Sequence, residues 1–255
     1  MFNSLELPIF LKTVPIKHLH NRCHYLKGTL FKADFFNENY GVISAFILDV
    51  PSTYRTKYHC KIKFMEVELF QKKHFDQINY SDSRMPGEAY EKCKFTSCNF
   101  TNSDLSRIEF IDCQFFECNF SLTKIDDAAF KNTGFNQCKI MGIDFGKCDD
   151  FLFIASFLGC NLDYSIFHGK NLKKFKFDHC SLKDVDFSNA DLTLAIFDSC
   201  DLLAASFFDT ILEKADFRTS YNYSLDPENN KIKKAKFSVT GLPGLLSKYN
   251  LDVEY

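Results

Sequence analysis

A five-residue period occupies residues 157–217 and limits what this chain can fold into. Its positions hold Phe157, Leu162, Phe167, Leu172, Phe177, Leu182, Phe187, Leu192, Phe197, Leu202, Phe207, Leu212 and Phe217. An α-helix repeats its buried face about every 3.6 residues and a β-strand about every second residue, so neither turns a side chain inward at every fifth position. A short fixed period instead predicts a solenoid, in which each unit buries its inner face by stacking on the next.

Compact residues form a second period, two positions before the large ones. Eight cysteines occupy it, several of them twenty residues apart: Cys93, Cys98, Cys113, Cys118, Cys138, Cys160, Cys180 and Cys200. We therefore expect four units to make one square coil, with Phe on two opposite walls and Leu on the other two. Alternating large and compact inward side chains fill a narrow interior. Packing explains these thiols better than a metal ladder, because a sealed core leaves little space for an ion.

The units resemble the pentapeptide repeat family, whose motif is A(D/N)LXX with the central Leu or Phe pointing inward. Close matches are Ala190-Asp191-Leu192, Ala215-Asp216-Phe217, Cys160-Asn161-Leu162, Cys200-Asp201-Leu202 and Ser103-Asp104-Leu105. The resemblance implies an all-β solenoid, a right-handed quadrilateral parallel β-helix, with a short C-terminal helix.

The period divides the chain into four segments. Residues 1–64 lack it and have no predicted fold, residues 65–89 form a lead-in or cap, residues 90–237 form the β-helix, and residues 238–255 form the C-terminal helix and tail. Inside the β-helix the register shifts by two residues within 146–151, and a solvated loop is expected at 218–231. The two-residue insertion has to bulge outward, either as a binding feature or as a simple register defect.

The first segment differs from the rest in charge. Residues 1–64 hold nine Lys/Arg against four Asp/Glu, a net of +5, whereas residues 65–255 hold 22 against 29, a net of −7. The segment has no secretory signal pattern, and its apolar run at 42–50 is too short to span a bilayer. An alternative is that Met65 is the natural start and that residues 1–64 are an upstream extension.

Five residues of this segment were weighed as metal ligands: His18, His20, Cys23, His59 and Cys60. Their spacing matches no closed zinc pattern, so we expect no metal and no cofactor. An odd and thiol-rich cysteine count is typical of a reducing compartment and predicts a cytoplasmic protein. The chain also lacks a glycine-rich phosphate loop, a G-x-S-x-G sequence and a C-x-x-C sequence, so we expect no enzyme.

The C-terminal part resembles the Qnr and McbG branch of the family, which comprises quinolone-resistance and microcin-immunity proteins. The resemblance is carried by Asp216-Phe217-Arg218, Asn222-Tyr223, Asp226-Pro227-Glu228, Lys233-Lys234-Ala235-Lys236-Phe237 and Gly244-Leu245-Leu246. It implies an acidic rod that resembles duplex DNA, binds DNA gyrase or topoisomerase IV, and forms a homodimer through its terminal helix.

Three candidate surfaces follow from this resemblance and from the outward positions of the repeat. The candidate acidic face comprises Asp104, Asp144, Asp186, Asp191, Asp201 and Asp216. The candidate partner loop comprises Tyr221, Tyr223, Asp226 and Glu228, and the candidate dimer contacts are Leu242, Leu245, Leu246 and Tyr249. Two lysine clusters, at 170–176 and 231–236, interrupt the acidic residues.

Two functions therefore remain open. One is a DNA-mimicking partner of a type II topoisomerase that protects it from quinolones or gyrase toxins, without direct nucleic-acid binding and without a membrane. The alternative is a structural scaffold or protein-interaction rod with an unidentified partner, in which the surface charges serve solubility alone.

Overall fold

The computed structural model describes residues 22–25, 30–37, 41–48, 69–149 and 153–251. The chain divides into two compact units, Met1–Leu69 and Phe70–Tyr255. The residues weighed as metal ligands and the alternative start at Met65 lie outside the described residues, except that the backbone of Cys23 is described.

The first unit contains an antiparallel sheet in the order β1-β2-β3. Its strands are β1 (Arg22–Tyr25), β2 (Leu30–Asn37) and β3 (Gly41–Leu48). The short apolar run that begins at Val42 forms most of β3, which is rich in β-branched and aromatic residues typical of strands. The sequence analysis did not predict this sheet.

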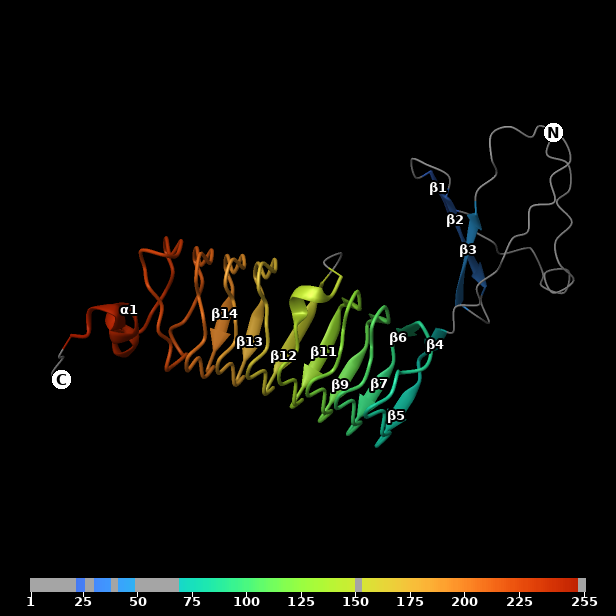
Figure 1. Ribbon diagram of the computed structural model, residues 1–255, viewed down its shortest axis with the longest axis horizontal. Helices are drawn as coiled ribbons and strands as arrows, with labels where there is room; N and C mark the ends of the chain where they lie inside the picture. Colours follow the sequence, from blue (N-terminus) through green and yellow to red (C-terminus); the bar gives the residue numbers. More distant parts are fainter. Residues whose placement is uncertain (1–21, 26–29, 38–40, 49–68, 150–152, 252–255) are drawn as a thin grey trace, which may run out of the picture. The chain divides into compact units, whose positions relative to one another are not determined.

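The second unit is a parallel β-helix built from short strands (Figure 1). One wall is a four-stranded sheet of β4 (Leu69–Gln71), β6 (Ala89–Glu91), β8 (Glu109–Ile111) and β10 (Ala129–Lys131). Another is a seven-stranded sheet of β5 (His74–Asp76), β7 (Lys94–Thr96), β9 (Gln114–Phe116), β11 (Thr133–Asn136), β12 (Ala155–Leu158), β13 (Lys176–Asp178) and β14 (Ile196–Asp198). Single bridges join neighbouring coils elsewhere.

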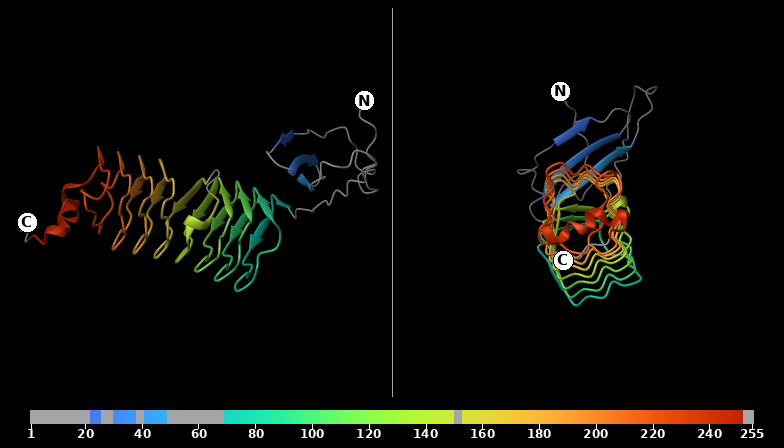
Figure 2. Two further views of the ribbon diagram at one scale, coloured as in Figure 1. Left: turned by 45° about the horizontal axis from the view of Figure 1, so that its top comes forward. Right: turned by 90° about the vertical axis from the view of Figure 1, so that its left-hand side faces the viewer.

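A four-sided outline is visible along the axis of the β-helix (Figure 2). Phe177 pairs with Phe157 and Phe197, each twenty residues away, so one coil takes four units. Four 3₁₀ or α-helical turns also occur in this unit: η3 (Phe145–Lys147), η4 (Val239–Gly241), α1 (Pro243–Leu246) and η5 (Ser247–Tyr249). The predicted fold class, a β-helix of five-residue units with a short C-terminal helix, is confirmed.

The corners between walls have a recurrent backbone conformation. Every fifth residue adopts a positive φ, for example Asn102 at 57° and Asn189 at 59°. At the first of these corners the N–H of Ser103 donates to the carbonyl of Phe100 at 3.0 Å, which closes a tight turn. Positive φ disfavours most side chains but is tolerated best by Gly, Asn and Asp, which explains why these residues recur at the corners.

The β-helix begins earlier than the sequence analysis placed it. Residues 70–89, assigned there to a lead-in or cap, form the first coil, in which the ring of Phe75 stacks on Phe95 at 4.7 Å and Tyr80 on Phe100 at 5.2 Å. Phe70, Phe75, Tyr80 and Met85 hold the same five-residue phase as Tyr90. The five-residue spacing is therefore present in the sequence of this first coil, but its units lack the A(D/N)LXX pattern.

The two-residue insertion lies between residues 148 and 154. The N–H of Asp149 still donates to the carbonyl of Ala128, 21 residues back as in regular coils, whereas Thr133 pairs with Ala155, 22 residues on instead of twenty. The position expected to hold the next inward residue, Leu152, lies outside the described residues. The ring of Phe153 lies 6.0 Å from the rings of both Phe145 and Phe175.

Replacement of one inward ring tests the register. Phe187 is fully buried, and its ring stacks on Phe167 at 5.4 Å and on Phe207 at 5.3 Å. We expect Phe187→Ala to lower the free energy of unfolding by about 3–5 kcal/mol, because it leaves a cavity between coils. The adjacent outward change Ser188→Ala should stay within about 0.5 kcal/mol in the same urea titration. Equal effects of the two changes would contradict the register.

Candidate interaction surface

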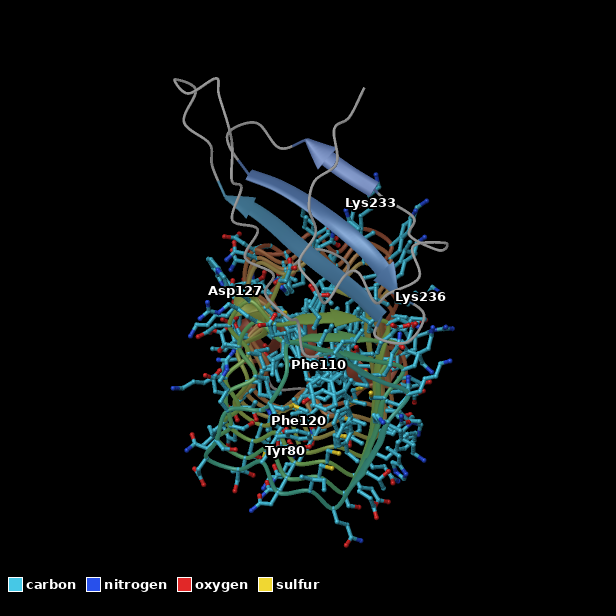
Figure 3. All side chains as sticks on the ribbon, turned by 90° about the vertical axis from the view of Figure 1, so that its right-hand side faces the viewer. Tyr80, Phe110, Phe120, Asp127, Lys233 and Lys236 are labelled. Carbon is cyan, nitrogen blue, oxygen red and sulfur yellow. The ribbon has the colours of Figure 1, made fainter. Side chains whose placement is uncertain are left out.

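The inward side chains are buried, so they determine which residues are left to contact a partner. The thirteen positions from Phe157 to Phe217 have exposed fractions of 0–6 %, and the eight cysteines of the second period have 0–2 %. Cys148, which the sequence analysis left unassigned, is also buried. In the view along the axis, Tyr80, Phe110 and Phe120 lie inside the walls, whereas Asp127 and Lys233 lie outside (Figure 3). The interior is therefore filled, and only the outer surface is available.

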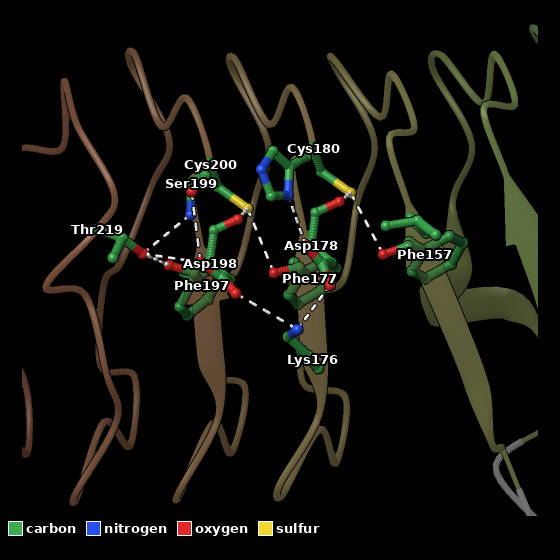
Figure 4. A network of polar contacts seen from close by, with 12 residues as sticks. Phe157, Lys176, Phe177, Asp178, Cys180, Phe197, Asp198, Ser199, Cys200 and Thr219 are labelled. Atoms are coloured by element: carbon green, nitrogen blue, oxygen red, sulfur yellow. Dashed lines mark hydrogen bonds and ion pairs between the residues drawn. The ribbon is translucent and has the colours of Figure 1, made fainter.

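Polar contacts between neighbouring coils cover much of that surface. In the seven-stranded wall, Lys176 Nζ lies 2.5 Å from Asp178 Oδ2 and 3.4 Å from Asp198 Oδ2 in the next coil (Figure 4). Hydrogen bonding to Asp178 raises the pKa of Lys176. The hydroxyl of Thr219, one coil further, donates to Asp198 Oδ1 at 3.2 Å. Side chains about twenty residues apart thus neutralise one another along the wall.

The six residues of the candidate acidic face lie on four different walls. Asp104, Asp144 and Asp186 share one wall, in which Asp144 and Asp186 both bridge to Ile166. The other three each occupy a wall of their own, with bridges from Asp191 to Ile211, from Asp201 to Tyr221 and from Asp216 to Lys236. These six carboxylates therefore do not form one continuous face.

Each of these six carboxylates also lies near a basic side chain. The contacts are Asp104–Arg84 at 3.3 Å, Asp144–Lys147 at 3.5 Å, Asp186–His168 at 3.8 Å, Asp191–Lys173 at 3.0 Å, Asp201–Lys183 at 3.3 Å and Asp216–Arg218 at 2.7 Å. Hydrogen bonding from Arg218 holds the pKa of Asp216 below its ordinary value. For the five carboxylates paired with Lys or Arg, the pairing reduces the negative field that they present to a distant partner.

The candidate partner loop is only partly exposed. Tyr221 has an exposed fraction of 51 %, but Tyr223 is buried, with its ring 5.6 Å from Phe217 and 5.8 Å from Phe237. Burial raises the pKa of Tyr223. The expectation of a wholly solvated loop is therefore corrected. Tyr223 and Leu225 point inward, because Asn222 takes a corner conformation with φ of 60° and moves the inward position by one residue.

The acidic residues of this loop are tied to the C-terminal segment. Lys248 Nζ lies 2.7 Å from Asp226 Oδ1 and 2.6 Å from Glu228 Oε2. The N–H of Leu225 donates to the carbonyl of Gly244 at 3.1 Å. A Cβ atom at Gly244 would lie only 2.1 Å from the carbonyl oxygen of Tyr223, so this close approach requires glycine. Loop and terminal helix thus form one end structure.

The candidate dimer contacts divide into two groups. Leu242, Leu246 and Tyr249 have exposed fractions of 45 %, 41 % and 53 %. Leu245 instead packs against the hydrophobic core and covers the last coil. Two further apolar side chains of the same segment, Val239 and Leu251, are also exposed. The end structure therefore presents an apolar patch, from which Leu245 is excluded.

The lysine cluster expected at 170–176 is reduced by one member. Lys170 has an exposed fraction of only 2 %, donates from Nζ to the carbonyl of Cys148 at 2.9 Å, and lies 5.0 Å from the centroid of the Phe153 ring. The interior accommodates a long side chain next to the insertion, at a position that compact residues hold in other coils. Lys170 therefore contacts residues on both sides of the insertion and does not contribute to the surface.

The outer surface of the described residues has a shallow pocket but no cluster of metal ligands. A shallow depression of about 230 Å³ is lined by Leu122, Gly142 and Asp144 among others. Within the described ranges, no group of three or more His, Cys, Asp or Glu residues could hold a metal ion. None of the helices in the described part of the chain combines the length and the apolar character needed to cross a membrane.

Removal of the buried ammonium group tests the role of Lys170. We expect Lys170→Met, which keeps the side-chain length, to lower the free energy of unfolding by about 1–3 kcal/mol, because a buried carbonyl loses a charged donor. Lys174→Met changes an exposed lysine in the same coil and should stay within about 0.5 kcal/mol. Both values follow from urea titrations monitored by circular dichroism. A Lys170→Met variant as stable as the parent would show that Lys170 does not fix the insertion.

Several solved structures, pentapeptide repeat proteins among them, are similar to this chain. QnrB1, a plasmid-mediated fluoroquinolone resistance protein, is 21 % identical with a TM-score of 0.39, over 72 % of this chain and 100 % of that chain. HetL, a protein involved in heterocyst differentiation regulation in the cyanobacterium Nostoc, is 14 % identical with a TM-score of 0.37, over 68 % and 89 % of the two chains. A protein of the Arabidopsis thaliana thylakoid lumen is 19 % identical with a TM-score of 0.21, over 48 % and 63 %. At these identities the likeness concerns the fold alone.

Two family models match the β-helix directly. One, described as a pentapeptide repeat region, matches residues 89–167, and the other, described as pentapeptide repeats in eight copies, matches residues 155–193 and 186–220. No curated protein sequence matches the chain. Together the two models cover residues 89–220, just over half of the 255 residues. The chain belongs to the pentapeptide repeat family.

Proposed function

We propose that this chain is a non-enzymatic binding protein that acts in the cytoplasm on a bacterial type II topoisomerase and protects it from quinolones or gyrase-directed toxins. One structural observation carries the binding function. The interior is filled by side chains, whereas the end structure exposes the apolar side chains of Val239, Leu242, Leu246 and Tyr249. Contiguous exposed apolar side chains are typical of protein-interaction sites.

The choice of topoisomerase as partner is supported by the C-terminal sequence. The residues that resemble the Qnr and McbG branch lie in or next to the end structure. Asp226 and Glu228 hold Lys248, and Gly244 lies against Tyr223. The motif residues therefore meet in one local structure, which favours a shared role over a chance likeness.

Mimicry of duplex DNA is not favoured as the basis of this contact. A DNA mimic needs a dense line of unpaired negative charge, whereas the six candidate carboxylates lie on four walls and beside basic groups. The same observation favours the second candidate function, a scaffold or interaction rod with a different protein partner. The two candidates differ in whether a topoisomerase responds to the protein.

A supercoiling assay distinguishes the candidates. DNA gyrase is incubated with relaxed plasmid and ciprofloxacin while the full-length chain is titrated. We expect supercoiling to recover, because the protein competes with formation of the drug-poisoned complex. The matched control is a variant with Leu242→Asp and Leu246→Asp, whose apolar patch is removed and which should rescue poorly. If the protein neither rescues nor inhibits supercoiling at any concentration, a topoisomerase partner is rejected and the interaction rod remains.

The same variant tests dimer formation, which belongs to this proposal. We expect the parent chain to have the mass of a dimer in multi-angle light scattering and the Leu242→Asp, Leu246→Asp variant to have that of a monomer, because two buried carboxylates would oppose pairing. Leu245 is left unchanged, since it covers the core. A dimer that persists in the variant would place the interface elsewhere.

A further inference from the structure

The last coils carry several lysines that form no ion pair, although Glu213 lies beside Lys214 in the chain. Five lysines, here called the lysine patch, are exposed and form no ion pair with any other residue in the described ranges: Lys174, Lys214, Lys231, Lys233 and Lys234. Their charge contrasts with that of residues 65–255 as a whole, which have a net charge of −7. The lysine patch is thus a positively charged area on a part of the chain whose net charge is negative.

The five lysines lie together on one edge of the β-helix. The N–H of Lys174 donates to the carbonyl of Thr193 at 2.9 Å, that of Leu194 to Glu213 at 2.9 Å, and that of Lys214 to Lys233 at 3.0 Å. Corner positions 174, 194, 214 and 234 therefore stack directly, and all four have a positive φ. In the axial view, Lys233 and Lys236 point outward on the side of the cross-section away from Asp127 (Figure 3).

The position of the patch explains why its charges are unpaired. In earlier coils a lysine reaches a carboxylate eighteen residues later, in the following coil, as Lys173 reaches Asp191 at 3.0 Å and Lys183 reaches Asp201 at 3.3 Å. Lys231, Lys233 and Lys234 belong to the last coil, after which the chain enters η4 and α1. No following coil supplies their partners.

We propose that the lysine patch binds the phosphate backbone of duplex DNA, independently of the topoisomerase proposal and against the expectation that the chain does not touch nucleic acid. Coils spaced by about 4.8 Å place the corner lysines along about 15 Å. One DNA strand carries a phosphate about every 3.4 Å along the helix axis, so four or five phosphates span the same length. Lysines hold three of the four corner positions, with Leu194 at the remaining one, and their span matches the length of one stretch of backbone.

The composition of the patch favours phosphate over an acidic protein. Protein interfaces are depleted in lysine and use aromatic and arginine anchors, none of which belongs to the patch. Lysine ammonium groups bind phosphate as point charges without further anchoring. The run Lys231-Ile232-Lys233-Lys234-Ala235-Lys236 is also of the lysine-rich kind found in nucleic-acid patches.

Fluorescence anisotropy with a labelled 20-base-pair duplex tests the proposal on the full-length chain. We expect binding at 50 mM KCl that weakens with salt, with a log–log slope approaching about −4.5 if all five lysines contact phosphate. A variant with Lys214→Glu, Lys233→Glu and Lys234→Glu should bind at least about 30-fold more weakly, with a slope shallower by about three.

The control makes the same change of charge elsewhere, with Lys72→Glu, Lys73→Glu and Lys139→Glu, all exposed and remote from the patch. This variant should retain most of the affinity, and circular dichroism should show both variants folded. If either does not fold, Gln replaces Glu at the same positions. No binding at 50 mM KCl, or equal loss in both variants, would overturn the proposal. Polyglutamate binding as tightly as the duplex would also overturn it and assign the patch to an acidic protein.

Discussion

Stacking of each coil on the next is the interaction on which the rest of residues 70–255 depends. In the seven-stranded wall, a column of rings continues from Phe75 to Phe237 with centroid separations of 4.6–5.9 Å. A single coil could not bury these rings, so each coil is stable only between two neighbours. The ends are the exception. At the C-terminal end Tyr223, Leu225 and Leu245 supply the apolar cover that a further coil would have given.

The strength of this constraint explains how much of the fold could be predicted. Thirteen inward positions follow from spacing alone, because every coil needs a side chain of similar volume at the same point. The constraint fails where spacing changes. Around the insertion, Lys170 and Phe175 occupy compact positions and fill the widened interior, which no local pattern indicates. In the last coil the five-residue spacing places Asn222 inward, but Asn222 forms a corner with a φ of 60° instead, and Tyr223 is buried in its place.

The candidate surfaces were harder to predict than the core, for a related reason. Spacing by multiples of twenty assigns an outward residue to a wall, and applying it to Asp191, Asp201 and Asp216 would have separated them. Spacing does not show which charges meet. The contact of Lys173 with Asp191 joins residues eighteen apart, on neighbouring coils, and depends on side-chain reach. An outward carboxylate in a repeat is therefore weak evidence for an acidic face until its neighbours in adjacent coils are known.

The same cross-coil pairing places the recognition features at the end of the β-helix. Along the walls, several opposite charges on successive coils form ion pairs, which lowers the field that they present to a partner. The last coil lacks a successor, so Lys231, Lys233 and Lys234 stay unpaired, and the segment that covers it exposes Leu242 and Leu246. Charge and apolar surface are thus both concentrated where the repeat stops. Charged side chains within the repeat can pair with those of the next coil, whereas those of the last coil cannot. The terminal residues are therefore the first to mutate in a search for the binding site.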